Sequence, residues 1–290
     1  MRTRFGRKVL FSALVSAAVL VSAEGLLAVA GLPSTGIYTG NLVTEWRLKP
    51  DLNRAAQHVE EGVAFPVRTS SLGFRDGEIP ADTPWVAAVG CSTTFGWGVN
   101  ADQAWPELLE EGLGIEVINA GVPGHSSHQG RAVALDLIAQ KPAALILSWM
   151  VRDVQRAPIA DKQAQAPKGL RAMRIFRWLA KRRRSPREAS QQGVHRVSPE
   201  DFGSNYQEVI QAASLANIPV LVVAFPMQES SPGHLAVLNQ LPVPVFAPEL
   251  ATEHFFASDP IHLNASGNLA LAQALVSPLQ SGLGLIEAVD

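Results

Sequence analysis

The chain has 290 residues, of which 47% are hydrophobic and 17% charged, so it is long enough to bury a large core without disulfide bonds or metals. Its formal net charge of −2 gives no general reason to expect nucleic-acid binding. Its one cysteine, Cys91, excludes an internal disulfide framework and any CxxC metal or redox site. Once the N-terminus is set aside, we expect one large α/β domain.

The N-terminal residues 1–33 have the pattern of a membrane anchor. Four basic residues lie within residues 1–8, and Glu24 is the one charged residue in 9–33. About 20 apolar residues cross a bilayer, and a basic flank stays on the cytoplasmic side. We therefore expect a single-pass anchor with the rest of the chain in the periplasm. The alternatives are a signal peptide cleaved at Val21-Ser22-Ala23, which would release a secreted protein, and a buried helix, in which the upstream charges would have no role.

Residues 34–83 are polar, rich in turn residues and weakly periodic. We interpret them as an extended linker that becomes ordered against the following domain. Within this linker, Ser71-Leu72-Gly73-Phe74-Arg75-Asp76 is either a docking turn or an ordinary loop, and periodicity does not distinguish the two.

Residues 84–290 alternate short apolar β-rich runs with helical patterns. Such alternation is typical of a parallel sheet with helices on both faces and a site at the carboxyl ends of the strands. Five strands are predicted, at 86–90, 115–119, 144–149, 220–225 and 243–246. Helices are predicted near 105–111, 128–140 and 201–217, with a last helix at 264–279.

A basic insertion at about residues 155–199 interrupts this alternation. Its basic residues are concentrated between Lys168 and Arg187, and an apolar helical stripe runs between them through Leu170, Met173, Phe176 and Leu179. A basic amphipathic helix of this kind binds an anionic membrane surface or an anionic polymer. The alternative is a solvated helix that packs through its apolar stripe on the domain.

The first predicted strand of the domain ends in Gly90 and is followed by Ser92, which places a hydroxyl at the carboxyl end of a sheet strand. A serine hydroxyl is a weak nucleophile, so Ser92 needs a base and an oxyanion hole. Of the seven histidines, His262 is the best placed, because it lies in a loop before the last helix, three residues after Asp259. The aspartate would orient the imidazole as in a serine triad. The same spacing also occurs in ordinary surface turns.

Two further strand ends bring polar groups to the same predicted edge. The second strand continues into Asn119-Ala120-Gly121-Val122-Pro123-Gly124, where glycines let a backbone N–H approach a ligand closely. The third ends in Met150-Val151-Arg152-Asp153. Three strand ends and a C-terminal loop therefore converge where an α/β sheet places its site.

These motifs resemble those of the SGNH/GDSL hydrolase superfamily. The segment from Gly90 to Gly98 is similar to its first block, usually Gly-Asp-Ser, Asn119-x-Gly121-x-x-Gly124 to its second, and Asp259-x-x-His262 to its last. The resemblance covers the chain from about residue 70 onward, apart from the basic insertion. The turn at 71–76 and the apolar anchor also resemble those of membrane-tethered members.

The resemblance implies a flavodoxin-like three-layer α/β/α fold with a shallow, solvent-open site. It implies Ser92 as nucleophile, His262 as base, Asp259 as the orienting carboxylate, and the N–H groups of Ser92 and Gly124 as oxyanion donors. We expect neither a cofactor nor a metal.

The chain departs from the family pattern at two positions. Cys91 stands where the family has aspartate, and we expect it to alter packing and backbone hydrogen bonding around the nucleophile turn. Arg152 stands where the third block, Gly-x-Asn-Asp, has the asparagine that supplies an oxyanion donor. A guanidinium is a charged but longer donor. Because losing one donor costs about 10²–10³ in kcat, a slow or repurposed enzyme fits the sequence as well as a fast one.

We therefore expect a membrane-anchored serine esterase that hydrolyses or transfers small acyl groups, such as acetyl, on a carbohydrate or cell-envelope polymer. The alternative is a catalytically degenerate domain that binds or scaffolds anionic envelope polysaccharide through Arg152 and the basic insertion. Covalent labelling of Ser92 by a fluorophosphonate separates the two.

Overall fold

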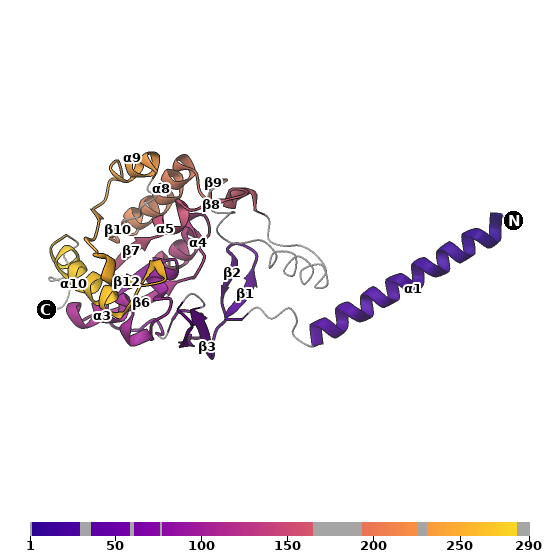
Figure 1. The fold of residues 1–290 in the computed structure, drawn as a ribbon. Helices are drawn as coiled ribbons and strands as arrows, with labels where there is room; N and C mark the ends of the chain where they lie inside the picture. The colour runs from indigo at the N-terminus through magenta and orange to yellow at the C-terminus, as the bar shows by residue number, and fades with distance from the viewer. Residues whose placement is uncertain are drawn as a thin grey trace. The chain divides into compact units, whose positions relative to one another are not determined.

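The computed structural model describes residues 2–29, 36–58, 61–75, 77–164, 193–225 and 231–282. It divides into two units, and the smaller one, residues 1–36 with 165–189, contains the long helix α1 (Arg2–Val29) (Figure 1). An 18-residue stretch of α1, Leu10–Leu27, has a mean hydropathy of 2.0 and is long and apolar enough to cross a membrane. A signal sequence has the same character, so α1 is compatible with either an anchor or a leader.

The larger unit, residues 37–164 with 190–290, is built on a five-stranded parallel sheet with the order β11-β10-β7-β5-β6. The strands are β5 (Trp85–Gly90), β6 (Glu116–Gly121), β7 (Ala144–Ser148), β10 (Val220–Val223) and β11 (Val245–Phe246). Numbered along the chain, the order is 2-1-3-4-5, which is that of flavodoxin-like folds and has its switch point between β5 and β7. The predicted sheet is confirmed, with β10 and β11 shorter than expected.

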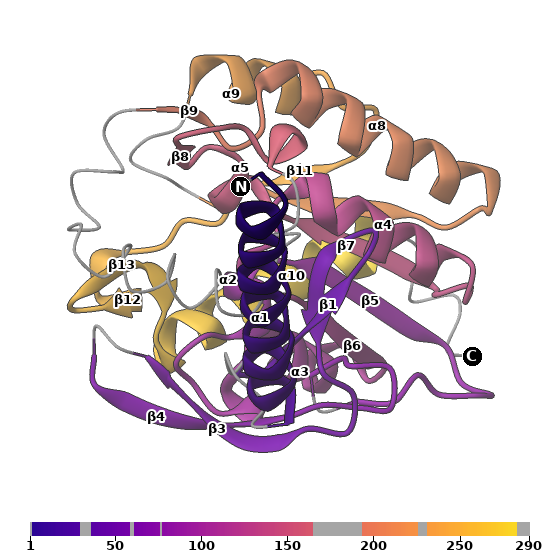
Figure 2. The same cartoon turned by 90° about the vertical axis from the view of Figure 1, so that its right-hand side faces the viewer.

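Helices cover both faces of this sheet, which confirms the predicted three-layer fold (Figure 2). Alternate residues of β5 and β7 face opposite ways, as the two-residue period of a strand requires. One face packs against α4 (Ser127–Ile138) and α8 (Pro199–Leu215), and the other packs against α3 (Trp105–Leu113) and α10 (Ala265–Gly282). These four helices lie where the sequence predicted helices.

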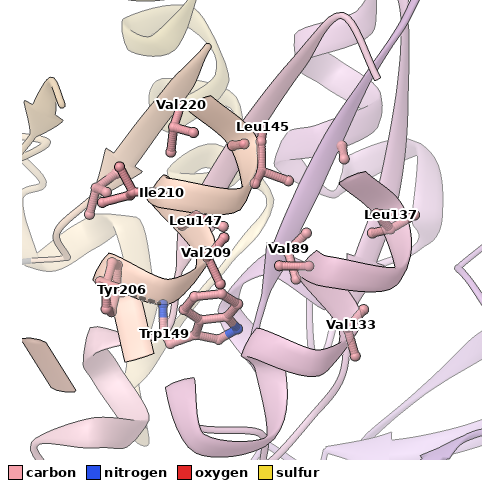
Figure 3. Packing of buried hydrophobic residues seen from close by; sticks show 14 of the residues in the cluster. Val89, Val133, Leu137, Leu145, Leu147, Trp149, Tyr206, Val209, Ile210 and Val220 are labelled. Carbon is pink, nitrogen blue, oxygen red and sulfur yellow. Dashed lines mark hydrogen bonds between the residues drawn. The ribbon is translucent and has the colours of Figure 1, made fainter. Parts of the chain in front are cut away.

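Figure 3 shows the first face, where aliphatic side chains of the sheet meet those of α4 and α8 around Trp149. The backbone N–H of Trp149 donates to the hydroxyl of Tyr206 at 3.4 Å. A Cβ at Gly130 would lie 2.1 Å from Nε1 of Trp149, so the indole fits against α4 only because this position is glycine. The tryptophan that follows β7 therefore joins both helices to the sheet and supports the segment after it.

Several short elements complete the larger unit. One-turn helices follow two strands, α2 (Ser92–Phe95) after β5 and α5 (Met150–Asp153) after β7. The remaining elements are α9 (Pro232–Leu238), the antiparallel pair β12 (Phe255–Phe256) and β13 (Asp259–Leu263), and 3₁₀ helices at Ala101–Gln103, Asp161–Gln163 and Thr252–His254. The sequence did not predict α9, whose seven residues are too few for a clear helical period.

The segment before the sheet, interpreted from the sequence as an extended linker, packs against the domain. It forms two antiparallel hairpins, β1 (Tyr38–Asn41) with β2 (Glu45–Leu48) and β3 (Asn53–His58) with β4 (Val63–Arg68). Apolar side chains of the hairpins form a buried cluster with α2 and the residues after β6: Ile37, Leu48, Phe65, Val67, Phe95 and Val122. This cluster is the reason that the segment folds onto the domain.

The ends of the basic insertion are joined by a short antiparallel pair, β8 (Arg156–Ala157) with β9 (Val194–His195). The predicted basic amphipathic helix between Lys168 and Arg187, with its stripe of Leu170, Met173, Phe176 and Leu179, lies outside the described residues. Its role stays a prediction.

Candidate active site

The nucleophile candidate Ser92 is the first residue of α2, directly beyond the carboxyl end of β5. The turn is tight: a Cβ at Gly90 would lie 2.6 Å from the carbonyl oxygen of Ser148, and one at Gly121 would lie 2.3 Å from the backbone nitrogen of Phe95. Glycine at the ends of β5 and β6 therefore lets α2 rest directly on the sheet. This close approach fixes where the Ser92 hydroxyl emerges.

Cys91 precedes Ser92 as the N-cap residue of α2 and makes no side-chain capping hydrogen bond. Its buried Sγ lies 3.2 Å from Oγ1 of Thr93, and it packs in the apolar cluster on the α3 and α10 face. The residue packs as a small side chain at the position where the SGNH/GDSL pattern has aspartate.

Arg75 holds the other end of α2 in place. Its side chain is 1% exposed and donates to the carbonyl oxygens of Phe95, Gly96 and Val99, the last two at 2.7 Å. Its backbone N–H donates to the carbonyl oxygen of Asn119 in β6, at 3.0 Å. The sequence left open whether residues 71–76 dock or form an ordinary loop, and these contacts of Arg75 favour the docking turn. Asp76 itself lies outside the described residues.

His262 lies within hydrogen-bond distance of both Ser92 and Asp259. Its Nε2 is 2.8 Å from Oγ of Ser92, and its Nδ1 is 2.5 Å from Oδ2 of Asp259. A carboxylate can only accept, so Nδ1 donates and Nε2 is left to accept the serine proton. The sequence placed the Asp-x-x-His pair in a loop, and that was wrong: both residues lie on β13, which is paired with β12.

The environment sets the charges of this pair. Burial raises the pKa of Asp259, but hydrogen bonds from His262 and from the N–H groups of Ile261 and His262 outweigh burial and lower it to about 2. Burial lowers the pKa of His262, and the opposing attraction of Asp259 does not fully restore it. At neutral pH the pair is therefore an ionised carboxylate beside a neutral imidazole, which is the form that a general base needs.

Arg152 comes from α5, on the other side of the switch point from Ser92. Its Nη2 lies 3.4 Å from Oγ of Ser92, and its Nη1 donates to Oε1 of Gln155 at 2.8 Å. In the described part of the chain, no carboxylate lies within ion-pair distance of this guanidinium. Its positive charge therefore faces the Ser92 hydroxyl without a neutralising anion from those residues.

Asp153 does not join Arg152 at the site. Its side chain turns into the core, where Oδ1 accepts the N–H of Ser127 at 2.7 Å, and burial raises its pKa to about 7. Successive residues of a helix point about 100° apart, so Asp153 is directed into the core while Arg152 is directed toward Ser92.

A cavity of about 310 Å³ opens over these groups. Its lining includes the expected residues Ser92, Gly124, Arg152 and His262, together with Tyr38, Gln57, Trp97 and Pro123. Tyr38 and Gln57 come from the two hairpins, and no sequence motif pointed to them. Burial raises the pKa of Tyr38 to about 12, so its hydroxyl stays protonated and can donate a hydrogen bond.

Hairpin β1–β2 also holds the turn that carries Gly124. Nε1 of Trp46 donates to the carbonyl oxygen of Pro123 at 3.2 Å, and its ring lies against Gly124, whose φ of +91° favours glycine. Nε2 of His125 bonds the carbonyl oxygen of Trp46 at 2.8 Å. The expected oxyanion turn is thus supported by a part of the chain that looked like a linker.

The side chains of His58, Asp259 and His262 place their ligand atoms within 4.8 Å of one another, which is the composition of some zinc sites. The bonds around them do not fit a metal. Nδ1 of His58 accepts the N–H of Glu61 at 3.3 Å, so the ring proton sits on Nε2, the nitrogen that faces Asp259. A histidine that binds metal through Nε2 needs the reverse arrangement, with a donating Nδ1–H.

No protein-family model and no curated protein matches this chain. Among solved structures, it is similar to a putative lipolytic protein of the G-D-S-L family from Desulfitobacterium hafniense, with 15% identity, a TM-score of 0.45 and coverage of 67% of this chain and 98% of that one. It is similar to TesA, with 18% identity and a TM-score of 0.47; the match covers 68% of this chain and 98% of TesA. It is also similar to the esterase EstA from Pseudoalteromonas sp., with 11% identity and a TM-score of 0.47; the match covers 69% of this chain and 98% of EstA. These similarities are remote.

Proposed function

We propose that this chain is a serine hydrolase of the SGNH type that acts on ester bonds. One observation carries the proposal: the hydrogen-bonded series from Ser92 Oγ to His262 Nε2 at 2.8 Å and from His262 Nδ1 to Asp259 at 2.5 Å. The series lies at the carboxyl edge of a parallel sheet, beside the switch point and under an open cavity. A nucleophile, a base and an orienting carboxylate in this order are the requirements for acyl transfer through a serine ester.

In the proposed reaction, Oγ of Ser92 attacks the ester carbonyl carbon while Nε2 of His262 takes the hydroxyl proton. Asp259 stabilises the imidazolium that forms. The tetrahedral intermediate collapses, the alcohol leaves with the proton from His262, and the acyl group stays on Ser92. Water or a sugar hydroxyl then attacks the acyl-enzyme with His262 again as base, which releases the acid or the transferred ester and restores the serine.

The oxyanion of that intermediate needs donors, and we assign the N–H groups of Ser92 and Gly124 and the guanidinium of Arg152. The N–H of Ser92 is at the first turn of α2, where helical N–H groups have no intrahelical acceptor. Gly124 and Arg152 line the same cavity. Because the guanidinium carries a full charge, it stabilises an oxyanion more strongly than the amide that the family places there.

We further propose a small acyl group, such as acetyl, on a carbohydrate or cell-envelope polymer as the substrate. The cavity of about 310 Å³ is matched to a small ester with part of its alcohol. Anchoring through α1 would place the enzyme at the membrane with its catalytic unit in the periplasm, and the basic insertion would contact an anionic polymer or membrane surface. Transfer and hydrolysis differ only in the acceptor.

The test is covalent labelling of the full-length protein by a fluorophosphonate, together with hydrolysis of p-nitrophenyl acetate. Ser92→Ala should abolish labelling and lower kcat by at least about 10³-fold. Ser204→Ala removes an exposed hydroxyl on α8 and should change neither. Labelling or hydrolysis that survives in Ser92→Ala would overturn the mechanism. An unlabelled wild type that binds an acidic polysaccharide in a salt-dependent manner would instead favour a degenerate binding domain.

A further inference from the structure

A second histidine lies against the aspartate of the proposed triad. His58 ends β3, is completely buried, and has its Nε2 3.2 Å from Oδ2 of Asp259, a close polar contact without the alignment of a hydrogen bond. The same oxygen accepts the Nδ1 proton of His262. The hairpin β3–β4 therefore reaches the catalytic centre with a polar side chain, in addition to the Gln57 that it places in the cavity.

The bonds of His58 determine which ring nitrogen carries the proton. Nδ1 accepts the backbone N–H of Glu61 at 3.3 Å, so the proton of the neutral ring lies on Nε2 and faces Asp259. The carboxylate of Glu61 in turn accepts the N–H of Ser258 at 2.6 Å, in the turn between β12 and β13. Two side chains of the β3–β4 hairpin thus contact the strand pair that carries Asp259 and His262.

The ring of His58 is held in this direction by its packing. Its centroid lies 4.8 Å from that of Phe256 and 5.7 Å from that of His262. A Cβ at Gly98 would lie 2.6 Å from Cδ2 of His58, so glycine there leaves room for the ring. Packing on several sides leaves Nε2 facing the carboxylate.

We propose that His58 is a positioning residue for Asp259, and that its Nε2–H weakens the pull of the carboxylate on the Nδ1 proton of His262. The inference rests on the proposed function. Oδ1 of Asp259 is held independently by the N–H groups of Ile261 and His262, at 2.9 and 3.3 Å. Loss of the His58 donor therefore leaves the carboxylate in place and changes how strongly it attracts the imidazolium.

The direction of the effect follows from the charges around His262. Asp259 attracts the imidazolium and the guanidinium of Arg152 opposes it, as does His58 in its charged form. In the neutral form assigned above, His58 acts through the Nε2–H that faces Oδ2 of Asp259, and Glu61 lies behind it on the hairpin. Removing His58 takes away the N–H beside Oδ2 of Asp259, so this oxygen interacts with the Nδ1 proton of His262 alone. The imidazolium becomes more favourable, so the acid limb of the pH profile of kcat/KM moves to higher pH. Each pH unit of such a move lowers kcat/KM on that limb by about 10-fold.

The experiment compares His58→Phe with His58→Gln in the full-length protein. Phenylalanine keeps an aromatic ring against Phe256 but has no donor, whereas the glutamine amide keeps a donor near the position of Nε2. His58→Asn is the second donor-loss variant, for use if His58→Phe does not fold, because its amide is too short to reach Asp259. His234→Gln is the matched control, since His234 is also buried and its Nε2 bonds a backbone carbonyl, that of Val197, at 2.9 Å.

Two readouts are recorded: the pH profile of kcat/KM with p-nitrophenyl acetate, and the titration of the His262 ring by NMR. We expect the acid limb and the His262 midpoint to move to higher pH in His58→Phe and His58→Asn, and to stay near wild type in His58→Gln and His234→Gln. Midpoints that do not rise in the donor-loss variants, or that rise as far with glutamine, would overturn the proposal. An inactive wild type would contradict the proposed function, while the NMR titration would still test His58.

Discussion

Replacing Arg75 by methionine tests whether the docking turn holds the nucleophile helix. The side chain donates to three buried carbonyl oxygens, those of Phe95, Gly96 and Val99. Methionine keeps a long apolar stem but leaves these acceptors without the guanidinium. A buried polar group that loses its partner costs about 1–3 kcal/mol, so for three acceptors we expect a loss of about 3–9 kcal/mol in the free energy of unfolding. This is a large part of the 5–15 kcal/mol that is typical of whole domains.

The assay is urea unfolding of the full-length protein, with the loss read from the midpoint and slope. The matched control is Arg131→Met, which removes an exposed arginine that pairs with Glu208 between α4 and α8. An exposed pair contributes about 0–1 kcal/mol. Because two of the three carbonyls, those of Phe95 and Gly96, lie at the end of the helix that begins with Ser92, kcat should also fall in Arg75→Met but not in the control. Unfolding free energies that agree within about 1 kcal/mol between Arg75→Met and Arg131→Met would refute the reasoning.

Two further predictions concern the segment after β7. Arg152→Met removes the proposed charged oxyanion donor and should lower kcat by about 10²–10³ with little change in KM, measured by steady-state kinetics; an unchanged kcat would exclude that role. Burial raises the pKa of Asp153 to about 7, so the folded state holds an extra proton between about pH 4 and that value, and stability should fall as pH rises through this range. Asp153→Asn should flatten this dependence in thermal melts from pH 5 to 8, whereas an unchanged slope would contradict the assignment.

The sequence by itself determined the central sheet and the position of the proposed nucleophile. Strands and helices are recognised by apolar residues that recur with periods of two and 3.6 residues, and this pattern is a property of a short stretch of chain. For the same reason Ser92 was placed at the end of a strand, whereas the three-residue spacing of Asp259 and His262 pointed to a triad only together with the converging strand ends and the family resemblance. Parallel strands end at one edge of the sheet, so Gly124 and Arg152 could be assigned to the same site.

Only the tertiary structure decided which other side chains complete the site. His58 and Tyr38 are in hairpins that lack a strong period, and their partners are far along the chain, so no local pattern marks them. The turn that contains Arg75 was noticed in the sequence, but the carbonyl oxygens that Arg75 binds were not. The tertiary structure also decided that Arg152 faces Ser92 while its neighbour Asp153 turns into the core, because adjacent residues of a helix point in different directions. Local sequence pattern determines the helices and strands, whereas contacts between segments that are distant in the chain determine which side chains meet at the site.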